Sequence, residues 1–505
     1  ATGLGLLAAR GEPPAETAPA QTPPALEQRL LELEKLNRSL LERFEDLSKK
    51  YDQLSERVKS EEKAAAKPAT PAAPKPPEPN PASSSSGSTK STSPVGSSWP
   101  VKADFGAKGL RFRTEDDRFS LEFHNEFQLD YRAFATEGPG PVRSSFYIPR
   151  ERFFFIGNIG KPLEYRISFN RGYGSGVDLL DAQVNLRIAE NHKILLGRYR
   201  VPSNYDWFQI ANLYFLSPER PLFSANYGMA RQIGAALNGK LLNSELEYAV
   251  GIYNGPRNSF EDFDNGQDVV GYLHYQPFLN SKSSPGLKNF GVGGTLNYGD
   301  QDNPLFPRSL RTLVNSSEAP GAGAASPTFF EFFRDVREDG VRGGGSLHAV
   351  YYGLGWSIIA QYDMQDTHYI PGPDKPSVLV PVRGWYVEAG YFLTGEQPEN
   401  RGPVKPLRPF KLKGPQRGWG AWELHARYST LELGDSVFLN RLADPAKSSR
   451  DAATLDLGFN WHWNDYVKLI FDWQRGIYGS PVDLGNEGGP LSHSDVFLMR
   501  FQVYF

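Results

Sequence analysis

Apolar and polar side chains alternate one by one through much of residues 101–505, and this period of two constrains the fold more than any other feature. From Phe119 to Ala133 every second residue is apolar, with Asn125 as the one break. The alternation returns in segments 163–169, 246–252, 422–428, 455–463 and 467–473. Such a pattern predicts strands with one apolar and one hydrated face. We expect an all-β body of about sixteen or seventeen strands.

Strand length and aromatic placement favour a barrel in lipid over a soluble β-sandwich, in which strands alternate in the same way. Predicted strands of about 10 residues suit a tilted bilayer crossing, whereas soluble strands commonly have about 5 to 6. Aromatic pairs such as Trp385 with Tyr386 and Trp461 with Trp463 lie at segment ends, where rings would meet lipid headgroups. No apolar stretch approaches the ~20 residues of a transmembrane helix. Short and long connections alternate, which is typical of a membrane barrel.

The chain ends in an alternating apolar face that runs to a terminal aromatic residue. Its members are Phe497, Met499, Phe501, Val503 and Phe505. This face resembles the C-terminal strand by which outer-membrane barrels are recognised for assembly. We therefore expect a protein of the cell outer membrane, with membrane lipid and the barrel-assembly machinery as partners.

The first hundred residues differ from the rest of the chain in composition and in sequence pattern. Residues 1–24 are rich in Ala, Pro and Thr and are predicted to be disordered. Residues 64–100 are rich in Pro and Ser and read as a linker. Because the sequence starts at Ala1 without Met, we expect a processed or trimmed chain.

Residues 25–63 carry a heptad repeat. Its core positions are Leu26, Leu30, Leu33, Asn37, Leu40, Phe44, Leu47, Tyr51, Leu54 and Val58. A narrow apolar seam flanked by charges predicts an oligomeric coiled coil, although a single helix packed on the body is the alternative. The mixed core residues do not decide between a dimer and a trimer.

Composition and motifs argue against an enzyme. The 55 Lys and Arg against 58 Asp and Glu give a net charge of −3, so nothing attracts nucleic acid in bulk. The chain has no Cys, which excludes thiolate catalysis and cysteine-based metal sites. Its eight His lack metal-ligand spacing, and the glycines at 172–176 are not followed by the Lys of a phosphate loop. We expect no catalytic residues, no metal site and no cofactor.

Several short motifs, in order, resemble the phosphate-selective porin O and P family of outer-membrane anion porins. They are Gly109–Arg113, Leu129–Arg132, Leu196–Pro202, Leu216–Arg220, Val250–Gly255 and Asn460–Trp463, together with the closing strand. The resemblance spans roughly residues 105–505 and implies a homotrimer of 16-stranded antiparallel transmembrane barrels, residues 101–505 here. It also implies that the segment after Pro202 folds into the lumen as a constriction loop. The N-terminal coiled coil and linker are an addition to the family pattern.

Charged residues on the polar parity are the candidates for a pore lining. On strands we expect Arg166, Arg198, Arg200 and Arg231 to face water, with Tyr199 on the opposite parity. The constriction segment adds Asp206, Glu219 and Arg220. The plainer interpretation is that all of these are ordinary hydrated residues of any porin. Because Arg220 is the only base between Pro202 and Ala230, we expect a weakly selective pore rather than tight phosphate specificity.

The sequence thus predicts passive diffusion of small hydrophilic solutes or ions, including anions such as phosphate. The N-terminal segment would lie in the periplasm and tether the outer membrane to peptidoglycan or another cell-wall component. The alternative is a mainly structural envelope tether or surface-layer protein with an incidental pore. Solute identity, ion preference and the roles of the long segments at 300–340 and 395–418 stay open.

Overall fold

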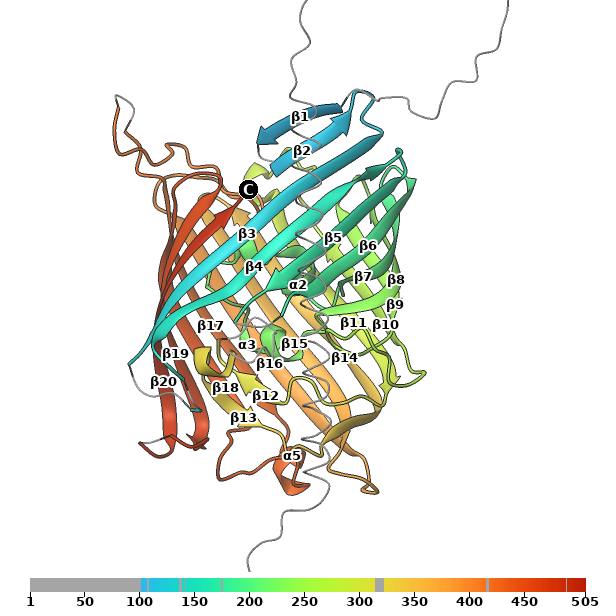
Figure 1. Ribbon diagram of the computed structural model, residues 1–505, viewed down its shortest axis with the longest axis vertical. Coiled ribbons are helices and arrows are strands. Elements are labelled where there is room, and N and C mark those ends of the chain that lie inside the picture. Colours follow the sequence, from blue (N-terminus) through green and yellow to red (C-terminus); the bar gives the residue numbers. More distant parts are fainter. Residues whose placement is uncertain are drawn as a thin grey trace, which may run out of the picture. The chain divides into compact units, whose positions relative to one another are not determined.

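Sixteen antiparallel strands form one closed ring, because the last strand pairs with the first strand of the ring. In order they are β3 (Phe119–Phe134), β4 (Ser145–Ile159), β5 (Leu163–Arg171), β6 (Asp178–Ala189), β7 (His192–Arg200), β8 (Arg231–Leu241), β9 (Leu246–Tyr253), β10 (Asp268–Tyr275), β11 (Asn289–Gln301), β14 (Arg337–Gly353), β15 (Trp356–Ile370), β16 (Val378–Phe392), β17 (Ala421–Leu433), β18 (Asp451–His462), β19 (Val467–Val482) and β20 (Leu491–Tyr504). The predicted 16-stranded barrel is confirmed (Figure 1).

The structure is a computed structural model. It describes residues 101–106, 109–135, 139–140, 142–173, 176–313, 322–414, 417–486 and 488–505. The segments predicted as disordered (1–24), coiled coil (25–63) and linker (64–100) lie outside the described residues, and so do the heptad core positions.

The first strand of the ring has two partners along its length. A hairpin of β1 (Val101–Gly106) and β2 (Gly109–Thr114) pairs with the beginning of β3, where Leu110 lies opposite Phe123. From Glu126 onward, β3 pairs with β20 instead, and this pairing closes the ring. The hairpin therefore extends the sheet beside the seam without entering the barrel (Figure 1).

The wall has its polar face inside and its apolar face outside. On β3, Glu126, Gln128, Asp130 and Arg132 are all 0% exposed, whereas Tyr131 between them is 39% exposed. On β17, Arg427 is buried while the neighbouring Tyr428 is exposed. This distribution is the reverse of a soluble protein, in which charged residues are almost never fully buried unless paired. The predicted apolar stripes therefore form the outer surface of the barrel.

The two ends of the barrel differ in their connections. At one end the strands are joined by the short turns 160–162, 190–191, 354–355 and 463–466, and we call this the turn end. The opposite, loop end carries the long segments 201–230, 302–336 and 434–450. Residues 393–420 are an exception, because they form a long connection at the turn end.

Two of the long segments contain most of the short helices of the described barrel and pack against each other. Segment 201–230 holds α2 (Tyr205–Gln209), η1 (Asn212–Tyr214) and α3 (Leu222–Tyr227), and segment 302–336 holds β12 (Ser309–Arg311), α4 (Ala322–Ala325) and β13 (Thr328–Glu331). The remaining helices are η2 (Pro285–Leu287) and α5 (Ser436–Leu439). One buried cluster joins Leu222 and Phe223 to Leu310 and Phe330. None of the helices in the described part of the chain has the length and apolar character to cross a membrane.

Candidate functional site

Segment 201–230, hereafter the internal loop, crosses the lumen and is held there by the wall. It begins where β7 ends, and Asn204 caps α2 by accepting a hydrogen bond from the Trp207 backbone N–H at 2.9 Å. Most of its residues are buried, and α2 and α3 lie within the ring of strands (Figure 1). The position that the family resemblance implied for a constriction loop is therefore the position of this segment.

Polar side chains of the wall satisfy the backbone of the internal loop. Lys468 Nζ donates to the carbonyl oxygens of Leu213 and Phe215 at 3.0 and 3.1 Å. Three further carbonyl oxygens accept hydrogen bonds from Arg427, Asn460 and Arg500, and Gln502 also donates to that of Leu213. An irregular segment buried away from water needs such partners, because an unpaired backbone carbonyl is costly. These donors all come from β17 to β20.

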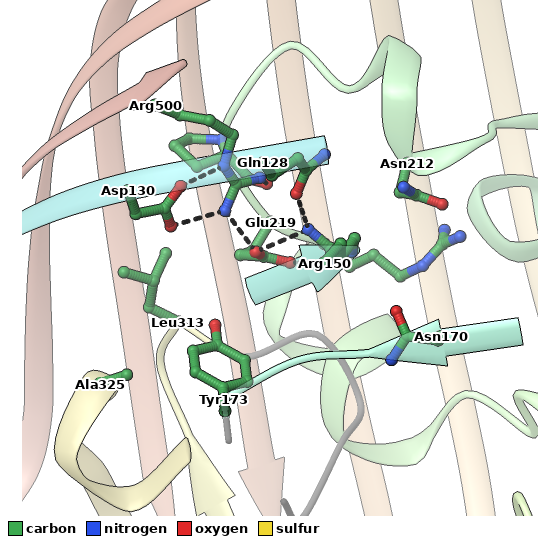
Figure 2. A network of polar contacts seen from close by, with 12 residues as sticks. Gln128, Asp130, Arg150, Asn170, Tyr173, Asn212, Glu219, Leu313, Ala325 and Arg500 are labelled. Atoms are coloured by element: carbon green, nitrogen blue, oxygen red, sulfur yellow. Dashed lines mark hydrogen bonds and ion pairs between the residues drawn. The ribbon is translucent and has the colours of Figure 1, made fainter. Parts of the chain in front are cut away.

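Glu219 is the anchor of the internal loop. Its carboxylate accepts hydrogen bonds from Arg150 Nη1 at 3.0 Å and from Arg500 Nη2 at 2.7 Å. Arg500 also contacts Asp130, with Nε 2.6 Å from Oδ1. In Figure 2, Glu219 lies between Arg150 and Arg500, and Asp130 approaches the same Arg500 guanidinium. We call these residues, together with Arg132, the anchor network.

Each arginine of the anchor network contacts a carboxylate. Arg132 pairs with Asp130 at 2.7 Å, and Arg427 on β17 pairs with Asp456 at 3.1 Å. Burial alone would raise the pKa of Glu219, but the neighbouring guanidiniums outweigh burial and hold that pKa well below its ordinary value. The carboxylate is therefore ionised at any physiological pH, and the network serves to fix backbone rather than to attract ions.

Arg132 links the internal loop to the second inward segment. Its Nη1 donates to the Ala325 carbonyl oxygen at 2.6 Å, and its Nη2 donates to the Tyr173 hydroxyl at 2.8 Å. Asn226 in α3 bonds both the N–H and the carbonyl oxygen of Arg311 at 2.9 Å. Segments 201–230 and 302–336 are thus fastened to the same wall and to each other.

A second group of arginines lies around Asp181 on the inner wall of β4 to β8. Arg231 Nε lies 2.8 Å from Asp181 Oδ1, and Arg166 Nε lies 3.6 Å from Oδ2. Arg200 is the cross-strand partner of Arg231, and its Nη1 donates to the Ile210 carbonyl oxygen at 2.9 Å. We call Arg152, Arg166, Arg200 and Arg231 the cationic wall.

Cations outnumber carboxylates in the cationic wall. Arg152 lies 3.6 Å from Glu126 and also donates to Asn170 and Asn212. With Asp181, Glu126 gives two carboxylates against the four guanidiniums. The Arg166 side chain keeps 35% of its surface exposed, so water in the lumen reaches it. The cationic wall therefore carries more positive than negative charge on the inner surface of the barrel.

The other predicted pore residues have partners outside the cationic wall. Arg220 pairs with Asp206 inside the internal loop and stacks on Trp207, with the guanidinium carbon 4.0 Å from the ring centre. Arg198 stacks on Phe260 at 3.9 Å and donates to the Asn258 carbonyl oxygen at 3.0 Å. Of the seven predicted pore residues, Arg166, Arg200 and Arg231 are the ones gathered in the cationic wall.

The predicted C-terminal face lies on β20. Phe497 and Met499 are 53% and 41% exposed, Phe501, Val503 and Phe505 are partly exposed, and Leu498, Arg500 and Gln502 between them are buried. Asn125 N–H donates to the Phe505 carbonyl oxygen at 3.2 Å, and the Phe505 N–H donates to the Asn125 carbonyl oxygen. The terminal residue is therefore joined to β3 at the closing seam.

Sequence reasoning did not select Asp130, Arg150, Arg152 or Asp181 as site residues. Asp130 lies on the polar face of β3 and Arg500 on that of β20. The alternation of each strand is the sequence signal that could have placed them inside the barrel. What the pattern lacks is any indication that these two residues, 370 positions apart, form an ion pair.

The sequence profile described as "Phosphate-selective porin O and P" matches residues 121–505. The chain belongs to this family. It is therefore an outer-membrane porin, a channel rather than an enzyme. Porin O of Pseudomonas aeruginosa is 21% identical over 422 residues, which cover 79% of this chain and 91% of that protein.

Solved porins give further matches. OmpT of Vibrio cholerae is 9% identical with a TM-score of 0.46, covering 77% of this chain and 98% of that chain. An anion-selective porin from Comamonas acidovorans is 12% identical with a TM-score of 0.44, covering 77% of this chain and 100% of that chain.

Proposed function

We propose that this porin passes small hydrophilic anions by diffusion through the part of the lumen between the internal loop and the cationic wall. The observation that carries the proposal is the charge balance of the inner wall. Elsewhere inside the barrel, Glu423 has a close cationic partner, Arg401 at 2.6 Å. Around Asp181 the guanidiniums are in excess, and a permeating anion would meet a positive potential there.

Weak, distributed attraction suits a diffusion pore. An ion must enter favourably and still leave, so several partly hydrated charges serve better than one tight site. Arg220 pairs with Asp206 and stacks on two aromatic rings. Its charge in the internal loop is therefore already paired. We therefore propose a general anion pore, with phosphate as one of several permeant anions.

The proposal is tested by the reversal potential of reconstituted channels in a salt gradient. The variant Arg166→Gln, Arg200→Gln, Arg231→Gln removes three charges from the cationic wall. Its reversal potential should move towards zero or change sign, since the two carboxylates then dominate. The matched control, Arg334→Gln, Lys375→Gln, Arg441→Gln, removes three charges from exposed positions at the loop end. An unchanged reversal potential in the first variant would contradict the proposal.

We propose two further roles for the heptad segment, a clamp for the homotrimer that the family resemblance implies and a tether from the outer membrane to the cell wall. A rod of residues 25–63 followed by an extended linker would reach on the order of 150 Å. Deleting residues 1–100 separates the two roles. Loss of envelope cohesion with intact conductance supports the tether, whereas dissociation into monomers supports a clamp for the trimer. If neither changes, both proposals fail.

A further inference from the structure

Residues 393–420 form a long connection at the turn end, where the strands on either side are joined by tight turns. They link β16 to β17, whereas the neighbouring β14 and β15, and β18 and β19, are joined by residues 354–355 and 463–466. A tight turn would have served the barrel equally well. The added length therefore calls for a role other than closing the wall.

The first half of this connection is fixed to the inside of the barrel. Arg401 is 6% exposed, and its Nη1 lies 2.6 Å from Glu423 Oε1. Its Nε and Nη2 donate to the Tyr214 carbonyl oxygen in the internal loop at 3.0 and 2.7 Å. The connection is therefore buried at Arg401, where it contacts the internal loop inside the barrel.

The second half crosses the rim to the outer surface. The Phe410 N–H donates to the Trp463 carbonyl oxygen at 2.7 Å, and its ring centre lies 5.1 Å from that of Trp461. Trp461 faces outward, because Asn460 and His462 beside it are buried on the inner face. The Trp461 Nε1 in turn donates to the Trp419 carbonyl oxygen at 2.7 Å. Phe410 and Trp419 therefore rest on outward-facing tryptophans of the turn end.

Between these two attachments the connection presents cations without partners. Within the described part of the chain, the side chains of Lys405, Arg408, Lys411 and Lys413 are exposed and form no ion pair or hydrogen bond. Exposed apolar side chains stand among and beside them: Leu407, Leu412 and Trp419 are 67%, 78% and 73% exposed. Cations and exposed apolar side chains are therefore interspersed beside the outward-facing tryptophans.

We propose that residues 405–413 dock onto anionic phospholipid headgroups of the leaflet at the turn end. Interfacial Trp rings mark the headgroup level of a membrane protein. Basic side chains near an anionic leaflet each gain about 1 kcal/mol, and apolar side chains beside them insert into the boundary. The segment reaches this level by resting on the outer face of β18, so its cations meet lipid phosphates rather than the lumen.

A matched pair of double variants tests the proposal in the full-length chain. Lys411→Gln with Lys413→Gln removes two charges from the docking surface. Lys282→Gln with Lys288→Gln removes two exposed charges from the connection 276–288 at the same end. Binding of a fluorescent short-chain phosphatidylglycerol to the detergent-solubilised protein is measured by anisotropy, in 50 mM and 500 mM NaCl, with phosphatidylcholine as the zwitterionic probe.

The expected result is that the first pair weakens phosphatidylglycerol binding by about thirtyfold at low salt, as two lost charges predict. The control pair should leave it nearly unchanged, and high salt should remove most of the difference. Single-channel conductance should be equal in both variants, which also verifies folding. Equal weakening by the two pairs, or equal binding of phosphatidylcholine, would overturn the proposal. So would a loss of oligomer mass confined to the first pair, since the occupant would then be a second copy of the chain.

Discussion

The anchor network and the cationic wall use the same residue type on the same inner surface and differ in how completely their arginines are paired with carboxylates. Around Glu219 and Asp130, each buried guanidinium is met by a carboxylate, and the loop backbone is held as a result. Around Asp181, the guanidiniums outnumber the carboxylates, and Arg166 stays partly hydrated. An arginine inside the barrel is therefore structural or selective according to the number of carboxylates within its reach.

Removing Glu219 should have the largest effect and tests the structural role of the anchor network. Glu219→Ala leaves Arg150 and Arg500 buried without their shared partner, which should lower the free energy of unfolding by about 3–5 kcal/mol. The internal loop should also leave the wall, giving larger and noisier single-channel currents. Thermal denaturation and bilayer recordings measure the two effects.

Its control is the exposed ion pair of Arg337 and Asp302, whose side chains are 45% and 55% exposed. Asp302→Asn should cost about 0–1 kcal/mol and leave the currents quiet. Equal losses in the two variants would mean that Glu219 is an ordinary surface carboxylate, contrary to the account.

Replacing Arg220 should have an intermediate effect, because this residue behaves as part of the anchored loop. Arg220→Lys keeps the charge but loses the flat stacking on Trp207 and Phe215, which should cost about 1–2 kcal/mol. The reversal potential should not change. A shift in ion preference with unchanged stability would instead assign Arg220 to the cationic wall.

Neutralising Asp181 tests the role of the cationic wall in ion selectivity. Asp181→Asn increases the excess positive charge without removing an arginine. A unit charge about 7 Å from an ion in water is worth about 0.6 kcal/mol, with opposite sign for anion and cation, so the anion-to-cation permeability ratio should rise roughly sevenfold. Reversal potentials in a salt gradient measure this ratio. A decrease would contradict the assignment of this cluster.

Acidification should have the smallest effect. Since the pKa of Glu219 is held below its ordinary value of 4.5, ionisation favours the folded state. That stabilisation is fully present above the ordinary pKa and is lost only as the pH falls through the lower folded-state value. Conductance noise from the internal loop should therefore be the same at pH 7 and pH 5. Noise that rises between these values would show that another group holds the loop.

Much of the barrel could be predicted from the sequence because alternation is a local property. The outward residues of β17, such as Trp422, Leu424 and Tyr428, are visible in the sequence as every second position. The rule fails near Gly197, whose φ of +112° departs from a regular strand. Tyr199 is accordingly buried in an interior cluster with Val201 and Met229, although its parity predicted the opposite face.

The site was less predictable because it depends on contacts between distant strands. No local pattern relates Asp130 to Arg500, or Glu219 to Arg150, and closure of the ring is what brings them together. The entry of segment 302–336 into the barrel was equally hidden, since its apolar residues pack against α3 and the wall rather than within one regular element.

The most direct test of the account is the zero-current potential of the unmodified channel across a tenfold KCl gradient. The cationic wall predicts that chloride carries most of the current, so the dilute side should become negative. A dilute side that becomes positive would show cation preference, and the selective role given to the arginines around Asp181 would then be contradicted.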